Sequence, residues 1–363
     1  MTTSENVINF RFNLIQALKE KGFSVSIVAN DEQRREEIIS LGVDFYCIEN
    51  SNRSVSVLKA NSYRKRLQRL IEKIGPDVVF TFQAKPNTFG VLAAKKAGVK
   101  RIFSMVEGAG DVFTKKGLKW NAIRAIVCHL YRKAFKYSNK VFFLNDDDKS
   151  EFIERRLVKE EQCELINGIG VDLRRFSFKP IKNDRTFIMI ARMLKTKGVF
   201  EYCECAKIVK QKYPDAVFNY LGSEGDVSVD NISMYIEDGT INYLGTTKDV
   251  RPYIEDALML LLCSYREGMP MSIMEAQAMG RGIITSNNVG CRDTVVDGYN
   301  GFLVEHKNVE MMANKCIYAI EHFDEMVIMG QNARKFAEEH FDSVLINSKV
   351  VAFLNESVAS IGE

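Results

Sequence analysis

Two glutamates, Glu267 and Glu275, stand eight residues apart directly after the apolar run Ala257 to Cys263. The run is short and bounded by turn residues, which is typical of a buried parallel strand. A tight loop follows it, and residues 271–279 are good helix formers with no Gly or Pro. Such a unit of strand, loop and helix binds ligands at the carboxyl end of a sheet. The free N–H groups at the helix N-terminus there suit a phosphate.

The same spacing also fits a solvated loop residue at Glu267 and a surface residue at Glu275. Met274, Ala276 and Ala278 surround Glu275, however, so an ordinary solvent-facing position is less expected there.

A pair of cations, Arg192 and Lys197, follows another short apolar strand, Phe187 to Ala191. Two fixed cations near a helix N-terminus can neutralise a diphosphate and stabilise it as a leaving group. The alternative is a pair of solvated surface side chains. Lys195 lies between them and is assigned to the surface.

The elements that position these residues alternate along the chain. Helices are expected at 9–22, 34–42, 63–74, 88–97, 115–137 and 271–279, and again at about 308–321, 325–340 and 343–357. Strands are expected at 23–29, 43–48, 78–82, 101–105, 140–144, 187–191 and 257–263, with two more that end at Gly222 and Gly245. Residues 145–186 are charged and linker-like. Strands that alternate with helices predict α/β folding around parallel sheets, in Rossmann-like halves.

At the loop after Cys263 the residues carry a family resemblance. EGMPMSIMEAQAMG at 267–280 resembles the E-x7-E segment of the retaining glycosyltransferases of family 4, and GCRDTVVDGYNGFLV at 290–304 is similar to the segment that follows it. The resemblance implies the GT-B fold, in which two Rossmann-like domains face each other across a cleft. It places the acceptor domain at 1–178, with a C-terminal helix at 342–363 crossing back, and the nucleotide-sugar domain at 179–341.

The resemblance also assigns roles in the second domain. It implies that Glu275 accepts hydrogen bonds from the ribose hydroxyls of a UDP-sugar, that Glu267 lies near the hydroxyls of the donor sugar, and that Arg192 and Lys197 bind the diphosphate. The loop around the first glutamate contributes further contacts to the sugar and phosphate, through Gly268, Met269, Pro270 and Met271. Gly222 and Gly245 lie where base and ribose approach the backbone, although simple turn glycines are the competing interpretation.

In the first domain, FQAKPNTFG at 82–90 and VEGAGDVF at 106–113 look like the branch that adds N-acetylgalactosamine or a similar sugar to polyprenyl-diphosphate-linked acceptors. Lys85, Asn87, Glu107, Gly108 and Gly110 are therefore expected to face the acceptor. Many relatives have a histidine where this chain has Glu107, so activation of the acceptor by histidine is in doubt.

The beginning of the chain departs from the family pattern. Relatives have a strand and a small-residue loop before the segment that VINFR resembles, and only MTTSE is present here. The first strand of the N-terminal domain is therefore expected to be missing, through a late start or a damaged copy. The missing strand motivates one rival to a hexosyltransferase, namely a catalytically impaired homologue that binds glycan or partner enzymes. A second rival is a nucleotide-sugar epimerase of the same fold. The dense glutamate and histidine set of such epimerases is not found.

Composition and charge limit the partners and the cellular location that we expect for this protein. Residues 1–178 carry 31 Lys and Arg against 21 Asp and Glu, while residues 179–363 carry 19 against 26. The segment 115–137 reads as a basic amphipathic helix, either a docking element for an anionic membrane surface or a core-facing helix with a solvated basic face. Motifs for nucleic acid are absent. Eight cysteines without C-x-x-C pairs are expected to be reduced thiols, and Asp146-Asp147-Asp148 to be a helix N-terminal cluster, not a metal site. We therefore expect a cytoplasmic, peripheral, metal-free enzyme of capsule or O-antigen type polysaccharide synthesis at the inner membrane face.

Overall fold

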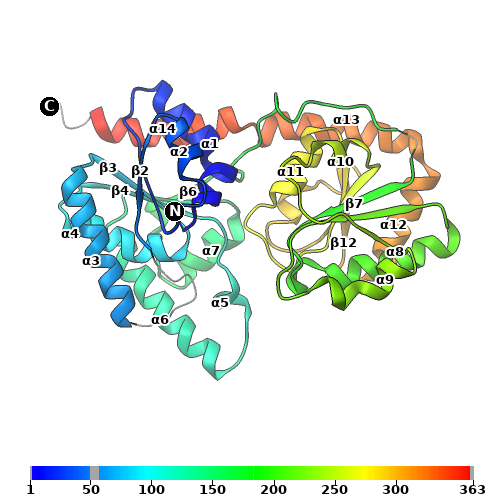
Figure 1. The fold of residues 1–363 in the computed structure, drawn as a ribbon, viewed down its shortest axis with the longest axis horizontal. Helices are drawn as coiled ribbons and strands as arrows, with labels where there is room; N and C mark the ends of the chain where they lie inside the picture. Colours follow the sequence, from blue (N-terminus) through cyan, green and yellow to red (C-terminus); the bar gives the residue numbers. More distant parts are fainter. Residues whose placement is uncertain (1, 50–56, 183, 360–363) are drawn as a thin grey trace. The chain divides into compact units, whose positions relative to one another are not determined.

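The computed structural model describes residues 2–49, 57–182 and 184–359. The chain forms two compact units, drawn in Figure 1. Unit 1 comprises residues 1–169 and 343–363, and unit 2 comprises residues 170–342. Each unit has its own parallel sheets and its own helices, as the alternation of strand and helix in the sequence predicts.

The strands of unit 1 form two separate sheets. One sheet pairs β1 (Ser26–Ala29) with β2 (Asp44–Cys47). The other has the order β3-β4-β5-β6, with bounds Val78–Phe82, Arg101–Val106, Lys140–Phe143 and Cys163–Leu165. All these pairings are parallel. Within the described residues no strand joins β1 to β3.

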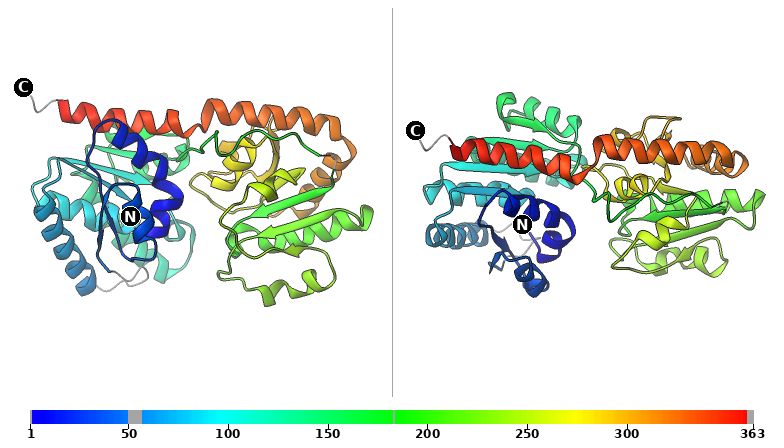
Figure 2. Two further views of the ribbon diagram at one scale, coloured as in Figure 1. Left: turned by 45° about the horizontal axis from the view of Figure 1, so that its top comes forward. Right: turned by 90° about the horizontal axis from the view of Figure 1, so that it is seen from above.

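The helices of unit 1 cover both sheets. They are α1 (Ser4–Glu20), α2 (Arg35–Ser40), α3 (Val57–Ile74), a π-helical turn (Pro86–Gly90), α4 (Val91–Lys96), α5 (Asp111–Thr114), α6 (Leu118–Phe135), α7 (Asp146–Glu154), a 3-10 turn (Glu160–Gln162) and α14 (Ser343–Ala359). α14 packs beside α1, as the two views of Figure 2 show, and Asn13 donates to Ser343 at 3.2 Å. The last helix of the chain thus belongs to the unit that contains its first helix.

Unit 2 has one sheet of six parallel strands in the order β12-β11-β10-β7-β8-β9. These strands are β7 (Thr186–Ile190), β8 (Val217–Leu221), β9 (Asn242–Tyr243), β10 (Met259–Leu262), β11 (Gly282–Ser286) and β12 (Gly301–Val304). The central strand β10 is buried at every position, as its run of apolar residues predicts.

The helices of unit 2 pack around this sheet. They are α8 (Val199–Lys212), α9 (Ser233–Glu237), α10 (Arg251–Glu255), α11 (Met271–Ala278), α12 (Val309–Glu321) and α13 (Phe323–His340), with 3-10 turns at Lys195–Lys197, Val229–Ile232 and Arg292–Thr294. One continuous apolar core runs through the unit. The fold therefore presents the ends of β7, β8 and β10 next to one another, where the predicted donor-site residues lie.

Two expectations for residues 145–186 need correction. The segment is not a linker throughout, since it contains α7 and the paired strand β6. α7 begins after Asn145, whose side chain accepts from the backbone N–H of Asp148, so the aspartates form the first turn of a capped helix. The division between the units also falls after residue 169 and not after residue 178. Phe176 is buried in the core of unit 2, and its carbonyl accepts from Arg334 at 3.0 Å.

Candidate functional site

Two of the predicted residues of unit 2 meet at the carboxyl ends of β7 and β10, where Glu267 and Lys197 form an ion pair. Oε1 of Glu267 also accepts from the hydroxyl of Ser264 at 2.5 Å. The Glu267 side chain is 13% exposed and that of Lys197 is 25% exposed, so a ligand can reach both. A carboxylate that is held by a cation and a hydroxyl still has further acceptor sites for sugar hydroxyls.

Two glycines allow the backbone of this site to pack closely. Gly198 adopts a left-handed conformation with φ of 80°, and a Cβ there would lie 2.6 Å from the carbonyl oxygen of Cys263. A Cβ at Gly290 would lie 2.4 Å from the carbonyl oxygen of Glu267. The backbone N–H of Glu267 donates to Val289 at 3.0 Å. The loop that carries Glu267 is therefore held between the start of α8 and the segment after β11.

Glu275 lies one turn inside α11 and is half-buried. Its carboxylate has neither a hydrogen bond nor an ion pair in the part of the chain that the structure describes. Burial raises its pKa to about 7, against a smaller lowering by Arg175 and a further rise from Asp249. An unpaired, partly desolvated carboxylate at this edge of the sheet is suited to accept two hydroxyl groups of a ligand.

Arg192 lies two residues past the end of β7 and is exposed. It forms no ion pair with any residue that the structure describes, in contrast to Lys197. The loop between the two cations is held by hydrogen bonds to residues outside it. The N–H of Lys195 donates to Asp226 at 2.9 Å, and that of Met193 donates to Ser223 at 2.8 Å. An exposed guanidinium on a fixed loop can bind a phosphate without first breaking an internal ion pair.

Gly222 and Gly245, at the ends of β8 and β9, are glycines for different structural reasons. A Cβ at Gly222 would lie 1.8 Å from the carbonyl oxygen of Ala191, so this glycine allows the ends of β7 and β8 to approach. Gly245 has φ of 71° with open space around its Cβ position, and its carbonyl accepts from Gly222 at 2.8 Å. A positive φ in a turn is enough to explain the glycine at position 245. The open space around its Cβ position leaves room for a ligand beside it.

The loop between Glu267 and α11 is largely packed into the protein. Gly268 and Pro270 are buried, while Met269 and Met271 are half-buried and pack against the core of unit 2. Pro270 is the N-cap of α11 and supplies no side-chain hydrogen bond, so the first N–H groups of this helix have no side-chain cap. Backbone contacts to a ligand are the role that this loop can fulfil.

In unit 1, the predicted residues lie at the carboxyl ends of β3 and β4. Glu107, directly after β4, forms an ion pair with Arg11 of α1. Lys85 is half-buried after β3, and burial lowers its pKa. Gly108 and Gly110 follow with φ of 139° and 77°, conformations that favour glycine. These residues form a second candidate site, which lies within unit 1.

Asn87 does not face a ligand, which corrects its predicted role. Its side chain has no exposed surface, its Oδ1 accepts from Thr81 at 2.8 Å, and its Nδ2 donates to the carbonyl of Met105 at 2.7 Å. Both halves of the amide are thereby used inside the protein. The residue joins the ends of β3 and β4 and so shapes the loops that carry Lys85 and Glu107.

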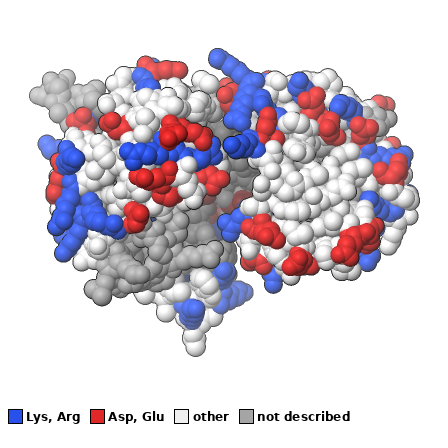
Figure 3. Space-filling model, viewed as in Figure 1, with Lys and Arg blue, Asp and Glu red and all other residues white. Residues whose placement is uncertain are grey.

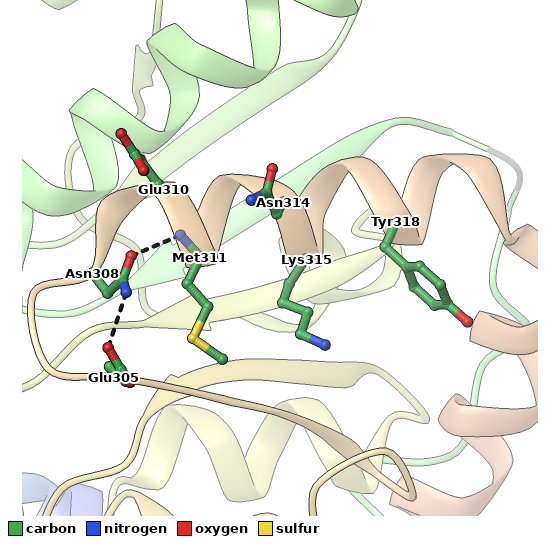
Figure 4. A pocket seen from close by; sticks show the side chains of 7 residues that line it. All are labelled: Glu305, Asn308, Glu310, Met311, Asn314, Lys315 and Tyr318. Carbon is green, nitrogen blue, oxygen red and sulfur yellow. Dashed lines mark hydrogen bonds between the residues drawn. The ribbon is translucent and has the colours of Figure 1, made fainter.

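A separate hollow of about 440 Å³ lies along α12 of unit 2 and is drawn in Figure 4. Asn308 caps this helix by accepting from the N–H of Met311 at 2.9 Å and donates to Glu305 at 3.1 Å. None of the predicted site residues lines it. Its walls come from Glu305, Asn308, Glu310, Met311, Asn314, Lys315 and Tyr318.

All eight cysteines are free thiols, as expected from their spacing. In the described ranges no group of three or more His, Cys, Asp or Glu residues could hold a metal ion. No helix in those ranges is long and apolar enough to cross a membrane.

The sequence analysis missed three residues that shape these sites. Ser264 holds Glu267, Asn288 holds the carbonyl of Ser264 at 2.9 Å, and Arg11 holds Glu107. Ser264 could have been found, because a polar residue that directly ends a buried strand lies at the ligand edge of a parallel sheet. Asn288 and Arg11 reach their partners from other elements and leave no local signal.

Two family models match the chain. "Glycosyl transferases group 1" matches residues 172–336, and "Glycosyl transferase 4-like" matches residues 4–145. The solved structure of Anabaena HepE in complex with UDP superposes with a TM-score of 0.81 at 16% identity, over 98% of each chain. Fold and site thus define a glycosyltransferase with the GT-B fold. Both models describe glycosyltransferases, and each matches a different part of the chain.

Curated relatives span nearly the whole chain. The N,N'-diacetylbacillosaminyl-diphospho-undecaprenol alpha-1,3-N-acetylgalactosaminyltransferase of Campylobacter jejuni is 28% identical, over 94% of this chain and 93% of the relative. A UDP-Gal:alpha-D-GlcNAc-diphosphoundecaprenol alpha-1,3-galactosyltransferase of Escherichia coli is 25% identical, over 91% and 88%. The capsular polysaccharide biosynthesis glycosyltransferase CapM of Staphylococcus aureus is 22% identical, over 94% and 93%. These relatives do not favour the alternative of an impaired, merely binding homologue.

Proposed function

We propose that this glycosyltransferase moves a hexose or N-acetylhexosamine from a UDP-sugar to a polyprenyl-diphosphate-linked or saccharide acceptor in surface polysaccharide biosynthesis. The observation that carries the donor half is the arrangement in unit 2, where Lys197 and Ser264 hold Glu267 and the carboxylate of Glu275 is left unpaired. The printed activities of the C. jejuni and E. coli relatives support the acceptor half.

The donor roles follow from charge and geometry. Glu275 accepts from the ribose diol, since its two carboxylate oxygens match two adjacent hydroxyls. Arg192 and the N-terminus of α11 bind the diphosphate, and Lys197 stabilises the negative charge that develops on it as the bond to the sugar breaks. Glu267 orients the donor sugar through its hydroxyls. These fixed cations and N–H donors perform the neutralisation that a metal performs in other transferases, so the proposed reaction needs no metal.

The acceptor is assigned to unit 1. Lys85 provides a cation for the diphosphate of the acceptor, and Glu107 provides a carboxylate for the hydroxyls of its sugar. Gly108 and Gly110 have positive φ angles, which favour glycine. The loop after β4 therefore has no side chains at these two positions.

A membrane-facing surface in unit 1 suits a lipid-linked substrate. α6 exposes Leu118 (90%) and Ile126 (53%) on one side, with Ala122 and Ala125 between them. Exposed cations flank this stripe at Lys115, Lys116, Lys119 and Lys133. Figure 3 shows Lys and Arg side chains at the lower end of unit 1, near the start of α6. An exposed apolar stripe beside basic side chains favours peripheral binding to an anionic membrane surface.

The test is a titration of UDP, with GDP as comparison, followed by transfer from UDP-sugars to a polyprenyl-diphosphate-sugar. We expect UDP to bind and the acceptor to stimulate its release, with the anomeric configuration of the donor retained. Glu275→Ala and Arg192→Ala should each weaken UDP binding by about tenfold or more, because each removes a charge-assisted hydrogen bond. Lys195→Ala, in the same loop as Arg192, is the matched control. Unchanged UDP affinity in both site variants, or no transfer by the wild type, contradicts the proposal.

A further inference from the structure

Arg11 on α1 is an arginine buried without full compensation. It is 3% exposed, and neither its Nε nor its Nη2 has a hydrogen-bond partner in the described chain. Its Nη1 donates to the carbonyl of Phe10 at 3.2 Å, and its guanidinium lies 4.3 Å from the ring centre of Phe82. Burial lowers its pKa to about 9. Removing a guanidinium from water costs several kcal/mol, so its position needs a partner that uses the charge.

That partner is Glu107, which is more open than the arginine behind it. The side chain of Arg11 is 4% exposed and that of Glu107 is 21% exposed. Glu107 comes directly after β4, and Phe82 is the last residue of β3. The ion pair therefore lies at the carboxyl edge of the sheet, where parallel sheets bind ligands, with its acidic member toward solvent.

The surrounding backbone is also unusual. Gln83, next to Phe82, has φ of 69°, a left-handed conformation that is strained for a non-glycine residue. Its side chain accepts from the backbone N–H of Thr2 at 3.1 Å, which connects this loop to the segment before α1. Strained backbone of this kind persists where surrounding contacts hold it, and it is concentrated at ligand sites.

We propose that Arg11 is a positioning residue for acceptor binding, which orients the carboxylate of Glu107 so that its free oxygen accepts hydrogen bonds from the hydroxyls of the acceptor sugar. The ring of Phe82 lies over the guanidinium, and Glu107 pairs with its charge. Arg11 itself does not touch the substrate. The inference rests on the proposed function, because it takes the acceptor of that reaction as the ligand of Glu107.

A double-mutant cycle tests this role. Arg11→Met and Glu107→Gln should each raise the KM for the polyprenyl-diphosphate-sugar acceptor by about tenfold, the loss expected for one charge-assisted hydrogen bond. UDP affinity should stay within about twofold, since the UDP site is assigned to unit 2. The double variant should have the same acceptor KM as Glu107→Gln alone, because Arg11 acts through the glutamate. Arg11→Lys should recover part of the loss, since it restores the charge without the planar fork.

Stability distinguishes this role from a merely structural one. Removal of one member of a buried pair destabilises a fold, whereas removal of both is often neutral. The double variant should therefore regain the thermal midpoint of the wild type and still bind acceptor poorly. Arg155→Met is the matched control, because Arg155 also pairs with a glutamate, Glu151, and lies 5.4 Å from the ring centre of Phe113.

Different results would overturn the positioning role and the proposed function. A double variant that regains wild-type acceptor KM, or an Arg11→Met variant with unchanged KM, overturns the positioning role while the proposed function stands. A wild-type chain that binds UDP and transfers to no polyprenyl-diphosphate acceptor overturns the proposed function and this inference with it.

Discussion

At the residue scale, the ionisation of Glu275 gives the donor site a pH dependence. Burial raises the pKa of this carboxyl to about 7 in the free protein. A ribose diol donates to the ionised form, so bound UDP lowers that pKa again and binding releases a proton when the pH is below about 7. We expect the affinity for UDP to fall by up to about tenfold per pH unit below about 7, measured by titration calorimetry in buffers of different ionisation enthalpy.

Glu275→Gln is the control for this prediction, because glutamine has the same shape without the titration. Its UDP affinity should be weaker than that of the wild type above pH 7 and nearly flat with pH. The pH dependence that this carboxyl gives to folding stability has the opposite sign to that of a salt-bridged carboxylate. A raised folded pKa means that stability is lost as the pH rises from the ordinary value of 4.5 to about 7. A wild-type protein whose UDP affinity does not change with pH contradicts the role of Glu275.

At the element scale, α6 can be tested as a membrane-binding helix. Leu118→Glu and Ile126→Glu each place a charge on its exposed apolar stripe. Each should weaken binding to anionic phospholipid vesicles by about tenfold or more, since burial of a large aliphatic side chain contributes about 1.5–3 kcal/mol. Sedimentation with vesicles measures the partition coefficient.

Two controls test whether vesicle binding depends on the position of the substituted side chain and on the charge of the lipid. Ile328→Glu changes a side chain on α13 that is 58% exposed and should leave vesicle binding unchanged. Binding of the wild type should weaken with salt and disappear on neutral vesicles, because the flanking lysines are attracted to anionic lipids. Equal binding of Leu118→Glu and wild type would instead make α6 a helix with an ordinary solvated face.

At the scale of the whole molecule, the two units differ in how their cores are built. Unit 2 has a six-stranded sheet and one continuous core, whereas the strands of unit 1 form two sheets over several smaller clusters. A split sheet leaves β1 and β3 with unpaired edges within the described residues. We therefore expect unit 1 to unfold at the lower temperature in a calorimetric scan.

UDP identifies the transitions in that scan. A ligand at about 100 times its Kd stabilises the unit that binds it by about 2.7 kcal/mol, which raises the midpoint of a domain of this size by roughly 5–10 °C. Only the transition of unit 2 should move, and Glu275→Gln should reduce the shift. A shift of the lower transition, or a single transition for the whole chain, contradicts this assignment.

The sequence was sufficient to predict most elements and the donor motif. β3 has the bounds that its apolar run predicts, and α11 begins at Met271, directly after Pro270, as expected from the helix formers that follow the loop. These features are local, since hydrophobic periodicity and helix stop signals act over a few neighbouring residues. The order of the residues along the chain was therefore enough to place Glu267 in a loop and Glu275 on a helix.

Only the tertiary structure decided which side chains meet. Lys197 and Glu267 lie 70 positions apart and form a pair because β7 and β10 are neighbours in the sheet. Asn87, expected to face a ligand, is buried because its amide joins β3 to β4, and Arg11 reaches Glu107 from a different helix. Such contacts depend on strand order and on how helices pack over a sheet, which no local pattern contains. Local patterns thus predicted the elements, whereas strand order and packing decided the partners of each charged side chain.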